Sequence, residues 1–423
     1  FRCEKQIRHD TFVRAVGRSL DALSVVASGL VPDWDGTEWT GKHATSNPAP
    51  HYRDVLTGSL NDNRIPAILV NDTTLIEWRQ RCIDLEFQCN AVFSGEHADR
   101  VLEVIASCGY ARPRQSEVWD VAQDRDFTNV TPVQMFTPRN MRGFRWEKAF
   151  IRHRPDGLRV RYNDATDNYV ERTIVVPRLG IGVAQPGRLE EIKYDGITTE
   201  YEAVFKAIYD QQQVIDRFTF YYGEVDAEQL VCRRGDLVLV QHDTLDQFAG
   251  FSRVLDFEGE GDLVETIQLD GTVSPVDAFF TTPTAFFDSP TPFFSSNVGV
   301  AIRLKNGTIT SFEAELSDDG FELTPITPVS AEGLERECLV STGKLLRANR
   351  RMLVFNIRPK ADLTADLTLV DEAPQLWQFP EPLEVTETFM RNRIINGSML
   401  FNQRDDLFSE SSGALQFSLD RWY

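Results

Sequence analysis

The sequence predicts a multidomain protein that is mainly β with a few helices (α+β). Its 423 residues exceed the size of one ordinary domain. From Arg139 onward, short segments of alternating apolar and polar residues recur between turn residues, which is typical of β-rich domains. Before that point, two segments place apolar residues at three- and four-residue spacing, which indicates helices. The apolar runs, such as residues 237–240, are too short to span a membrane.

Three segments are predicted to be helical, at residues 72–88, 96–108 and 199–213. Asn71, Asp72 and Thr73 are candidate N-caps of the first helix, and Gly109 ends the second. The apolar stripe of the first helix is predicted to contain Leu75, Ile76, Cys82, Ile83 and Leu85. Residues 46–50, which are rich in Pro and Asn, predict a loop.

Strands are predicted along most of the remaining chain. They lie at residues 115–122, 144–150, 157–162, 171–176, 188–194, 217–222, 232–242, 265–269, 298–304, 351–358 and 365–370, with a further short strand at Arg253. The sequence Lys-Asn-Gly-Thr at residues 305–308 is a strong hairpin signal. Residues 374–387 are rich in Pro and acidic side chains, which predicts a linker.

The cysteines and histidines show no metal-ligand spacing. No two cysteines are spaced C-x2-C, so we interpret them as buried thiols rather than a disulfide framework or a zinc site. The histidines are equally scattered, and we predict neither a metal nor a cofactor. The six cysteines are Cys3, Cys82, Cys89, Cys108, Cys232 and Cys338.

No catalytic constellation is evident, and we predict no catalytic residues. The sequence contains no G-x-S-x-G, Walker or G-x-G-x-x-G motif. A Cys82–His97 pair has nothing beyond its residue types in its favour. The tripeptide Arg-Gly-Asp at residues 234–236 is interpreted as a plain turn at a strand entrance. The acidic pairs Glu190/Glu191, Asp318/Asp319 and Asp405/Asp406 are interpreted as solvated surface rather than as a glycosidase pair.

The charge balance restricts the possible partners. The chain carries 44 basic and 64 acidic side chains, a formal charge of -20. Such an excess argues against a nucleic-acid groove over much of the surface, since phosphate binding needs local positive charge. The first residue is Phe1 and no secretory leader follows it, so we expect this chain to be part of a longer polypeptide.

A local repeat of phenylalanine pairs is the most distinctive candidate contact site. The pairs recur every seven residues, and prolines between them exclude a helical heptad. We predict an extended insertion whose rings pack on their own domain or, as we favour, on a neighbouring subunit. The other interpretation is a hydrophobic probe for a receptor or a membrane. The residues are Phe279, Phe280, Phe286, Phe287, Phe293 and Phe294.

The order of several segments resembles the central tail-tip hub, or host-specificity, proteins of lambda-like siphophages. Residues 45–57 resemble that family's "DNPAW…LDLLT" segment, with Pro50 in place of Trp. Residues 230–241 resemble "PGDLVRV", with Arg234 where Pro is usual. The resemblance covers about residues 40–375. It also rests on residues 78–92 ("F-x-C-N-G-V"), 192–213 ("GVT…A", with Ile197 for Val), 253–254 with 267–270 ("GRV…VTLD") and 351–374 ("RVxxIxP…ATLTLVDYAP").

The resemblance implies a tail-hub architecture with an inserted, barrel-like domain. The implied division is residues 1–230 as hub, 231–345 as inserted barrel with the phenylalanine insertion, 346–375 as strands returning to the hub, and 376–392 as linker. Residues 393–423 resemble the start of phage carbohydrate-binding modules ("NLLINGxFxxWQRG…TADRWY"). Within them, Asn396 and Trp422 are candidate residues of a distal module.

The implied function is that of a structural virion protein at the tail tip, assembled in the host cytoplasm. It would form a homotrimer, contact tail-tube and distal tail proteins, recognise a host surface receptor for which a glycan is one candidate, and let DNA pass through an acidic lumen without specific binding. No stable membrane insertion is implied. A tail-associated enzyme that degrades polysaccharide or peptidoglycan is the alternative, and a free carbohydrate-binding protein ranks last.

Overall fold

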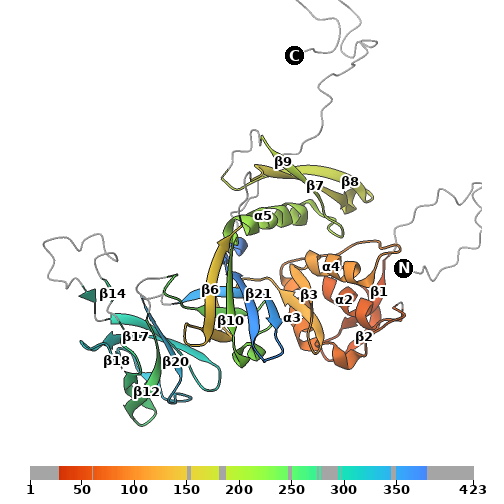
Figure 1. Cartoon of the computed structure of the whole chain (residues 1–423). Coiled ribbons are helices and arrows are strands. Elements are labelled where there is room, and N and C mark those ends of the chain that lie inside the picture. Colours follow the sequence, from red (N-terminus) through yellow and green to blue (C-terminus); the bar gives the residue numbers. More distant parts are fainter. Residues whose placement is uncertain are drawn as a thin grey trace, which may run out of the picture.

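The computed structural model describes residues 28–59, 61–149, 154–180, 187–245, 250–273, 276–277, 294–295, 297–343 and 349–378. The prediction of a mainly β protein with a few helices is confirmed. A central six-stranded sheet separates a helical region on one side from a β-barrel on the other (Figure 1). None of the helices within these ranges is long and apolar enough to cross a membrane.

The helical region begins with an antiparallel strand pair and ends with a hairpin. Its elements are β1 (Leu30–Trp34), β2 (Trp39–Ala44), α2 (Pro48–Thr57), η2 (Ala67–Leu69), α3 (Asp72–Asp84), α4 (Ala98–Cys108), β3 (Ala111–Gln115) and β4 (Trp119–Gln123). Trp78 and Tyr52 are its largest fully buried side chains, and their rings meet edge to face. The Trp78 indole also donates a hydrogen bond of 2.9 Å to the Gly109 carbonyl, which ties α3 to the end of α4.

Four predictions for this region need correction. The loop predicted at residues 46–50 is the start of α2, because the Asn47 side chain caps the Ala49 N–H at 3.0 Å and Pro48 occupies the first turn. The helix predicted to reach residue 88 ends at Asp84. Its predicted stripe fails at Ile83 and Leu85, which are exposed, while Trp78 is buried instead. The strand predicted at 115–122 is the β3–β4 hairpin, with its turn at residues 116–118.

The central sheet has the strand order β5-β11-β21-β22-β10-β6, and only the β5–β11 pair is parallel. One face packs on a core that includes Tyr221, Met352 and Leu369. The other face, here called the pocket face, carries Leu353 and Val370 in a smaller cluster. The strands are β5 (Gln134–Phe136), β6 (Met141–Lys148), β10 (Thr219–Val225), β11 (Leu237–Val240), β21 (Arg350–Pro359) and β22 (Ala365–Asp371).

A closed six-stranded barrel lies between β11 and β21 in the sequence. The strands run in the order β12-β20-β16-β17-β18-β13, and β13 pairs back with β12 to close the ring. The predicted turn at 305–308 joins β16 to β17. The elements are β12 (Gly250–Glu260), β13 (Leu263–Leu269), β16 (Asn297–Arg303), β17 (Ile309–Leu316), β18 (Glu322–Pro325), β19 (Val329–Ser330) beside β13, and β20 (Leu339–Gly343).

The start of the inserted segment also needs correction. Residues 232–242 were predicted as one strand of the insertion, but only β11 (Leu237–Val240) is a strand, and it pairs with β21 in the central sheet. A small apolar cluster of Met135, Leu239, Ala301 and Leu339 joins the sheet to the barrel. The Gln241 side chain adds a 2.7 Å hydrogen bond to the Thr342 carbonyl.

The last unit is a three-stranded sheet packed on α5 (Glu200–Asp216). Thr199 is the N-cap of this helix, which agrees with the helix start predicted at Thr199. The helix and the sheet share one core with the helical region. The linker predicted from Pro374 is wrong for its first residues, because Leu376 is fully buried in η6 (Pro374–Trp377), which packs on α5. The remaining elements are β7 (Gly157–Asp164), β8 (Val170–Pro177), β9 (Leu189–Lys193), η3 (Ala165–Asp167), η4 (Ala227–Val231) and the pair β14 (Val276–Asp277) and β15 (Phe294–Ser295).

Candidate functional site

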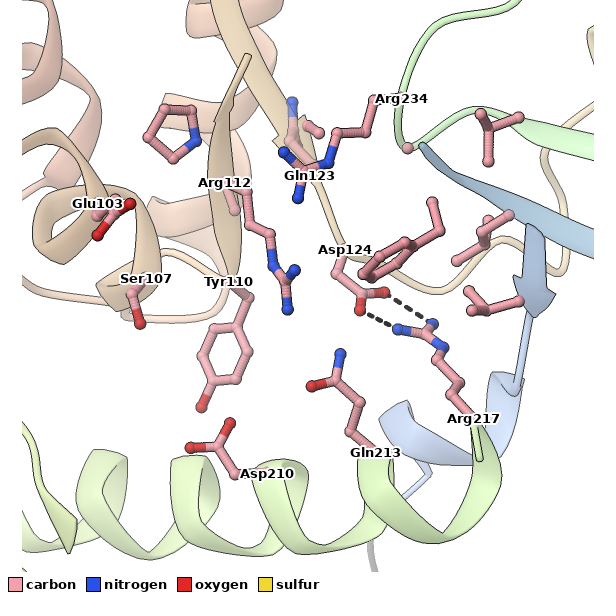
Figure 2. A pocket seen from close by; sticks show the side chains of 18 of the residues that line it. Glu103, Ser107, Tyr110, Arg112, Gln123, Asp124, Asp210, Gln213, Arg217 and Arg234 are labelled. Carbon is pink, nitrogen blue, oxygen red and sulfur yellow. Dashed lines mark hydrogen bonds and ion pairs between the residues drawn. The ribbon is translucent and has the colours of Figure 1, made fainter. Parts of the chain in front are cut away.

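A pocket of about 1020 Å³ lies where the helical region, α5 and the central sheet meet (Figure 2). Helix α4 and the β3–β4 hairpin form one wall, and α5 forms the opposite wall. The pocket face of the sheet contributes Phe355 and Phe220. The pocket is therefore lined by segments that lie far apart in the sequence.

Two carboxylates next to α5, those of Asp124 and Asp210, form ion pairs with basic side chains of this part of the chain. Arg217 pairs with Asp124, with 3.0 Å between Nη2 and Oδ1, and the Tyr209 hydroxyl also donates to Asp124. Burial lowers the pKa of Arg217, but the hydrogen bonds and charges of Asp124 and Tyr209 together outweigh it, so the pKa is raised and the ion pair persists. Lys206 pairs with Asp210 at 2.7 Å.

Tyrosines next to these pairs stay protonated. The Tyr194 hydroxyl donates to Asp210 at 2.7 Å. Burial, reinforced by nearby carboxylates, raises the pKa of Tyr110, Tyr194 and Tyr209. The α5 wall is thus a set of mutually satisfied hydrogen bonds and ion pairs that fixes the shape of the pocket.

Two arginines on the opposite side have no such partner. Arg112 projects from β3, and Arg234 from the turn before β11. The guanidinium carbon of each lies 5.9 Å from the centre of the Phe355 ring. Within the described ranges, neither guanidinium forms an ion pair or a side-chain hydrogen bond, and Figure 2 shows both reaching into the pocket across from α5. Burial and the charge of Arg112 lower the pKa of Arg234.

The turn that presents Arg234 is fixed on two sides. The Gly235 N–H donates to the Val354 carbonyl at 2.8 Å, and the Val354 N–H donates to the Asp236 carbonyl at 2.9 Å. Gly235 has φ +91°, and a Cβ there would lie 2.9 Å from the Ala122 Cβ. The turn therefore depends on glycine both for its backbone conformation and for its contact with β4.

The surroundings of these arginines carry a local excess of positive charge. Arg114 pairs with Asp120 at 2.6 Å and lies 3.5 Å from Asp236. It also donates to the Arg234 carbonyl at 2.8 Å. Arg114 thus forms ion pairs with both Asp120 and Asp236. Arg112 and Arg234 add two positive charges that form no ion pair with the described residues.

Aromatic side chains continue from the pocket along the sheet, together with polar ones. A second, shallower hollow of about 220 Å³ lies beside it and shares Phe220 and Phe355. Arg145 of β6 lies over the Tyr222 ring, 4.9 Å from its centre. Phe355 itself is 37% exposed. The pocket and this hollow together form an elongated surface of aromatic rings bordered by arginines.

Of the residues predicted as contact sites, the structure describes only the backbone of Phe294. Phe279, Phe280, Phe286, Phe287 and Phe293 lie outside the described residues, as do Asn396 and Trp422. The backbone of Phe294 is in β15, paired with Asp277 of β14, so the two ends of the phenylalanine insertion lie side by side.

The pocket arginines were missed because the turn prediction considered only the backbone of residues 234–236. The turn itself is confirmed. The available signal was the departure from the resembled pattern, which has Pro at the position of Arg234. The other residues, Arg112 and Phe355, are isolated in the sequence and carry no signal of their own.

The thiol prediction is confirmed for the cysteines that the structure describes. Cys82, Cys89, Cys108, Cys232 and Cys338 are buried and free, while Cys3 lies outside the described ranges. Burial raises the pKa of both Cys82 and Cys232 to about 12, which keeps them unreactive. No cluster of three potential metal ligands occurs among the residues described.

Comparisons with known proteins give only distant similarities. No protein-family model and no curated protein matches the sequence. Among solved structures, the chain is similar to a tail protein from Neisseria meningitidis MC58, with 11% identity, a TM-score of 0.29, and coverage of 46% of this chain and 62% of that one. It is also similar to a 43 kDa tail protein of prophage MuSo2 from Shewanella oneidensis, with 11% identity, a TM-score of 0.26, and coverage of 60% and 54%. The chain therefore spans less than two thirds of either protein, and similarity at these TM-scores assigns no function.

Proposed function

We propose that this chain is a structural protein of a phage tail, the central hub of a siphophage tail tip. In this role it joins the tail tube to distal receptor-binding parts and takes part in host recognition and genome delivery. The observation that carries a docking role is the pocket, because Asp124 and Asp210 are engaged in ion pairs while Arg112 and Arg234, beside the exposed Phe355, form none with the residues that the structure describes.

The tail-hub part of the proposal is supported by the order of sequence segments over about residues 40–375. The insertion of a closed barrel between two paired strands of another sheet agrees with the architecture that the resemblance implies. Such an arrangement suits a hub, since a rigid sheet holds the barrel while its pocket face stays free to bind another protein.

The oligomeric state in solution tests the hub proposal. We expect light scattering at two protein concentrations to give three times the chain mass of 48.1 kDa. We further propose that the phenylalanine pairs lie in the trimer interface, so that Phe286→Asp combined with Phe287→Asp yields monomers. The control is Phe321→Asp, which changes an exposed phenylalanine of the barrel. A monomer at both concentrations contradicts a hub that trimerises by itself.

Activity on the host envelope tests the enzymatic alternative. The hub proposal expects no clearing when the purified protein is applied to a zymogram of host polysaccharide or peptidoglycan. Clearing that persists after a further purification step contradicts a purely structural role.

A further inference from the structure

We propose that Arg112, Arg234 and Phe355 form a binding site for an acidic protein segment. In this site a carboxylate of the segment binds between the two guanidinium groups, and an apolar side chain next to it packs on the Phe355 ring. The partner is a tail protein that presents such a segment. This inference rests on the docking role proposed above for the pocket and names the chemistry of its partner.

The first argument is electrostatic. Arg112 and Arg234 lie on the same ring, 5.9 Å from its centre, so two like charges are held close together without a counter-ion in the described structure. Arg234 is partly buried, which weakens the screening of its charge by water, while Arg112 is exposed, and the charge of Arg112 still acts on Arg234. A bound carboxylate removes this repulsion and can accept hydrogen bonds from both planar guanidinium groups.

The second argument is that the site is rigid before anything binds. Arg112 is on a paired strand, Phe355 is on β21, and the Arg234 turn is hydrogen-bonded to β21. Each guanidinium carbon lies 5.9 Å from the centre of the Phe355 ring, so a cation–π contact favours these positions of both side chains. A partner therefore loses little free energy to ordering this surface on binding, which favours its use as a docking site.

The third argument concerns the kind of anion. The pocket rim on α4 carries Asp99 and Glu103, and the whole chain has a charge of -20. A long polyanion such as nucleic acid meets repulsion beyond the two arginines. A short segment with one or two carboxylates and an apolar residue avoids this repulsion. The hollow beside Phe355 gives the rest of such a segment aromatic rings to pack on and the polar side chains of Asn356, Arg358 and Thr368 to bind.

Binding of a defined peptide tests the inference. The probe is a fluorescein-labelled peptide in which glutamates flank a phenylalanine, and the comparison peptide has glutamines instead. By fluorescence anisotropy we expect the glutamate peptide to bind more tightly than the glutamine peptide, and to weaken as salt is added. The double variant Arg112→Gln and Arg234→Gln should lower its affinity at least about tenfold.

The control removes the same charge elsewhere. Arg142 and Arg336 are each 70% exposed in surface ion pairs away from the pocket, and their double Gln variant should leave affinity unchanged. Lysine at positions 112 and 234 keeps the charge but loses the planar fork, so an intermediate affinity is expected. The lysine variant also keeps the test decisive if the Gln variant does not fold.

Several results would overturn the inference. Equal binding of the two peptides, or equal loss in the control variant, removes the specific role of the arginine pair. Tighter, arginine-dependent binding of oligothymidylate identifies nucleic acid as the ligand. Self-association that the Arg112/Arg234 variant abolishes identifies a second copy of the chain as the occupant. If the chain forms trimers but does not bind the peptide as expected, the hub proposal stands and the docking site is refuted. If the chain is a monomer that binds the peptide as expected, the docking site stands and the trimeric hub is refuted.

Discussion

Glycine 235 shows how one residue positions the candidate site. It permits the left-handed backbone of the turn and lets that turn contact Ala122 of β4. Both neighbours matter, since Arg234 reaches the pocket and Asp236 lies near Arg114. The position of the Arg234 side chain therefore depends on the backbone conformation of its neighbour Gly235.

Substitution of this glycine should be more costly than substitution of a glycine with similar backbone geometry in open space. Gly235→Ala adds both left-handed strain and a Cβ that lies 2.9 Å from the Ala122 Cβ, and we expect a loss of about 2–3 kcal/mol. Gly307→Ala, at φ +85° with no atom within 4 Å, should cost only about 1 kcal/mol. Urea unfolding measures both losses, and equal losses would show that the contact with Ala122 does not matter.

Glu202 provides a test of pH dependence at the scale of one side chain. It accepts hydrogen bonds of 2.7 Å from the Gln88 N–H and from the Thr199 hydroxyl. Burial nevertheless raises its pKa above the ordinary value of 4.5. The folded state therefore holds this proton more strongly than the unfolded state, so the stability contributed by the group is full below pH 4.5 and declines as the pH rises through the folded pKa.

Glu202→Gln removes this titration. We expect the free energy of unfolding of the variant, relative to the native chain, to increase as the pH is raised from 4 to 7. The comparison cancels the titration of all other shared groups. Urea unfolding followed by tryptophan fluorescence measures the difference, and a difference that is constant with pH would contradict the raised pKa.

At the scale of elements, the ion pair between Arg217 and Asp124 links three parts of the fold. Arg217 caps the end of α5, Asp124 follows β4, and the same guanidinium donates to the carbonyls of Asp371 and Glu372 at 3.1 and 2.7 Å. Only 7% of the Arg217 side chain is exposed. The pair therefore joins the helix and the hairpin that form opposite walls of the pocket.

Loss of this pair should destabilise the protein far more than loss of a surface pair. Arg217→Gln leaves Asp124 and two carbonyls without their donor, and we expect a loss of about 3 kcal/mol. Arg100→Gln, which breaks an exposed contact with Glu103, should cost less than about 1 kcal/mol. Similar losses for the two variants, measured by urea unfolding, would show that the buried pair contributes little.

The elements also show which predictions sequence can make. Local chemistry identified Asn71 as one of three candidate caps, the start of a helix at Thr199 and the turn at residues 305–308, because each depends on adjacent residues. The start of α2 was missed because Pro48 in a first helical turn has the composition of a loop. The burial of Trp78 and the Arg112–Phe355–Arg234 site could not be predicted, since their partners come from distant parts of the chain.

At the scale of the whole molecule, the barrel and the rest of the chain should fold separately. The barrel has its own core, and Val240 and Arg350, which flank it, are directly paired. We expect a chain that joins Val240 to Arg350 through Asn-Gly to keep the central sheet, since this dipeptide favours a two-residue hairpin. It should be less stable by a few kcal/mol, because Met135 and Leu239 lose their barrel contacts.

Circular dichroism and thermal unfolding test this prediction. A cooperative transition in the shortened chain, together with one in residues 250–343 alone, supports independent folding. A shortened chain without a cooperative transition would mean that the sheet needs the barrel.

The attachment of the barrel has a mechanical consequence. The barrel is connected to the same end of two adjacent antiparallel strands, β11 and β21. A force that pulls the barrel away from the central sheet therefore acts on the hydrogen bonds between these strands one after another, starting at that end. Before these hydrogen bonds break, the force acts on the side contacts, which are the Met135–Leu239–Ala301–Leu339 cluster, the Gln241–Thr342 hydrogen bond and the Arg139–Asp270 ion pair of 3.2 Å. We therefore expect a small force on the barrel to break these side contacts first. The barrel then tilts relative to the central sheet while the hydrogen bonds between β11 and β21 stay intact.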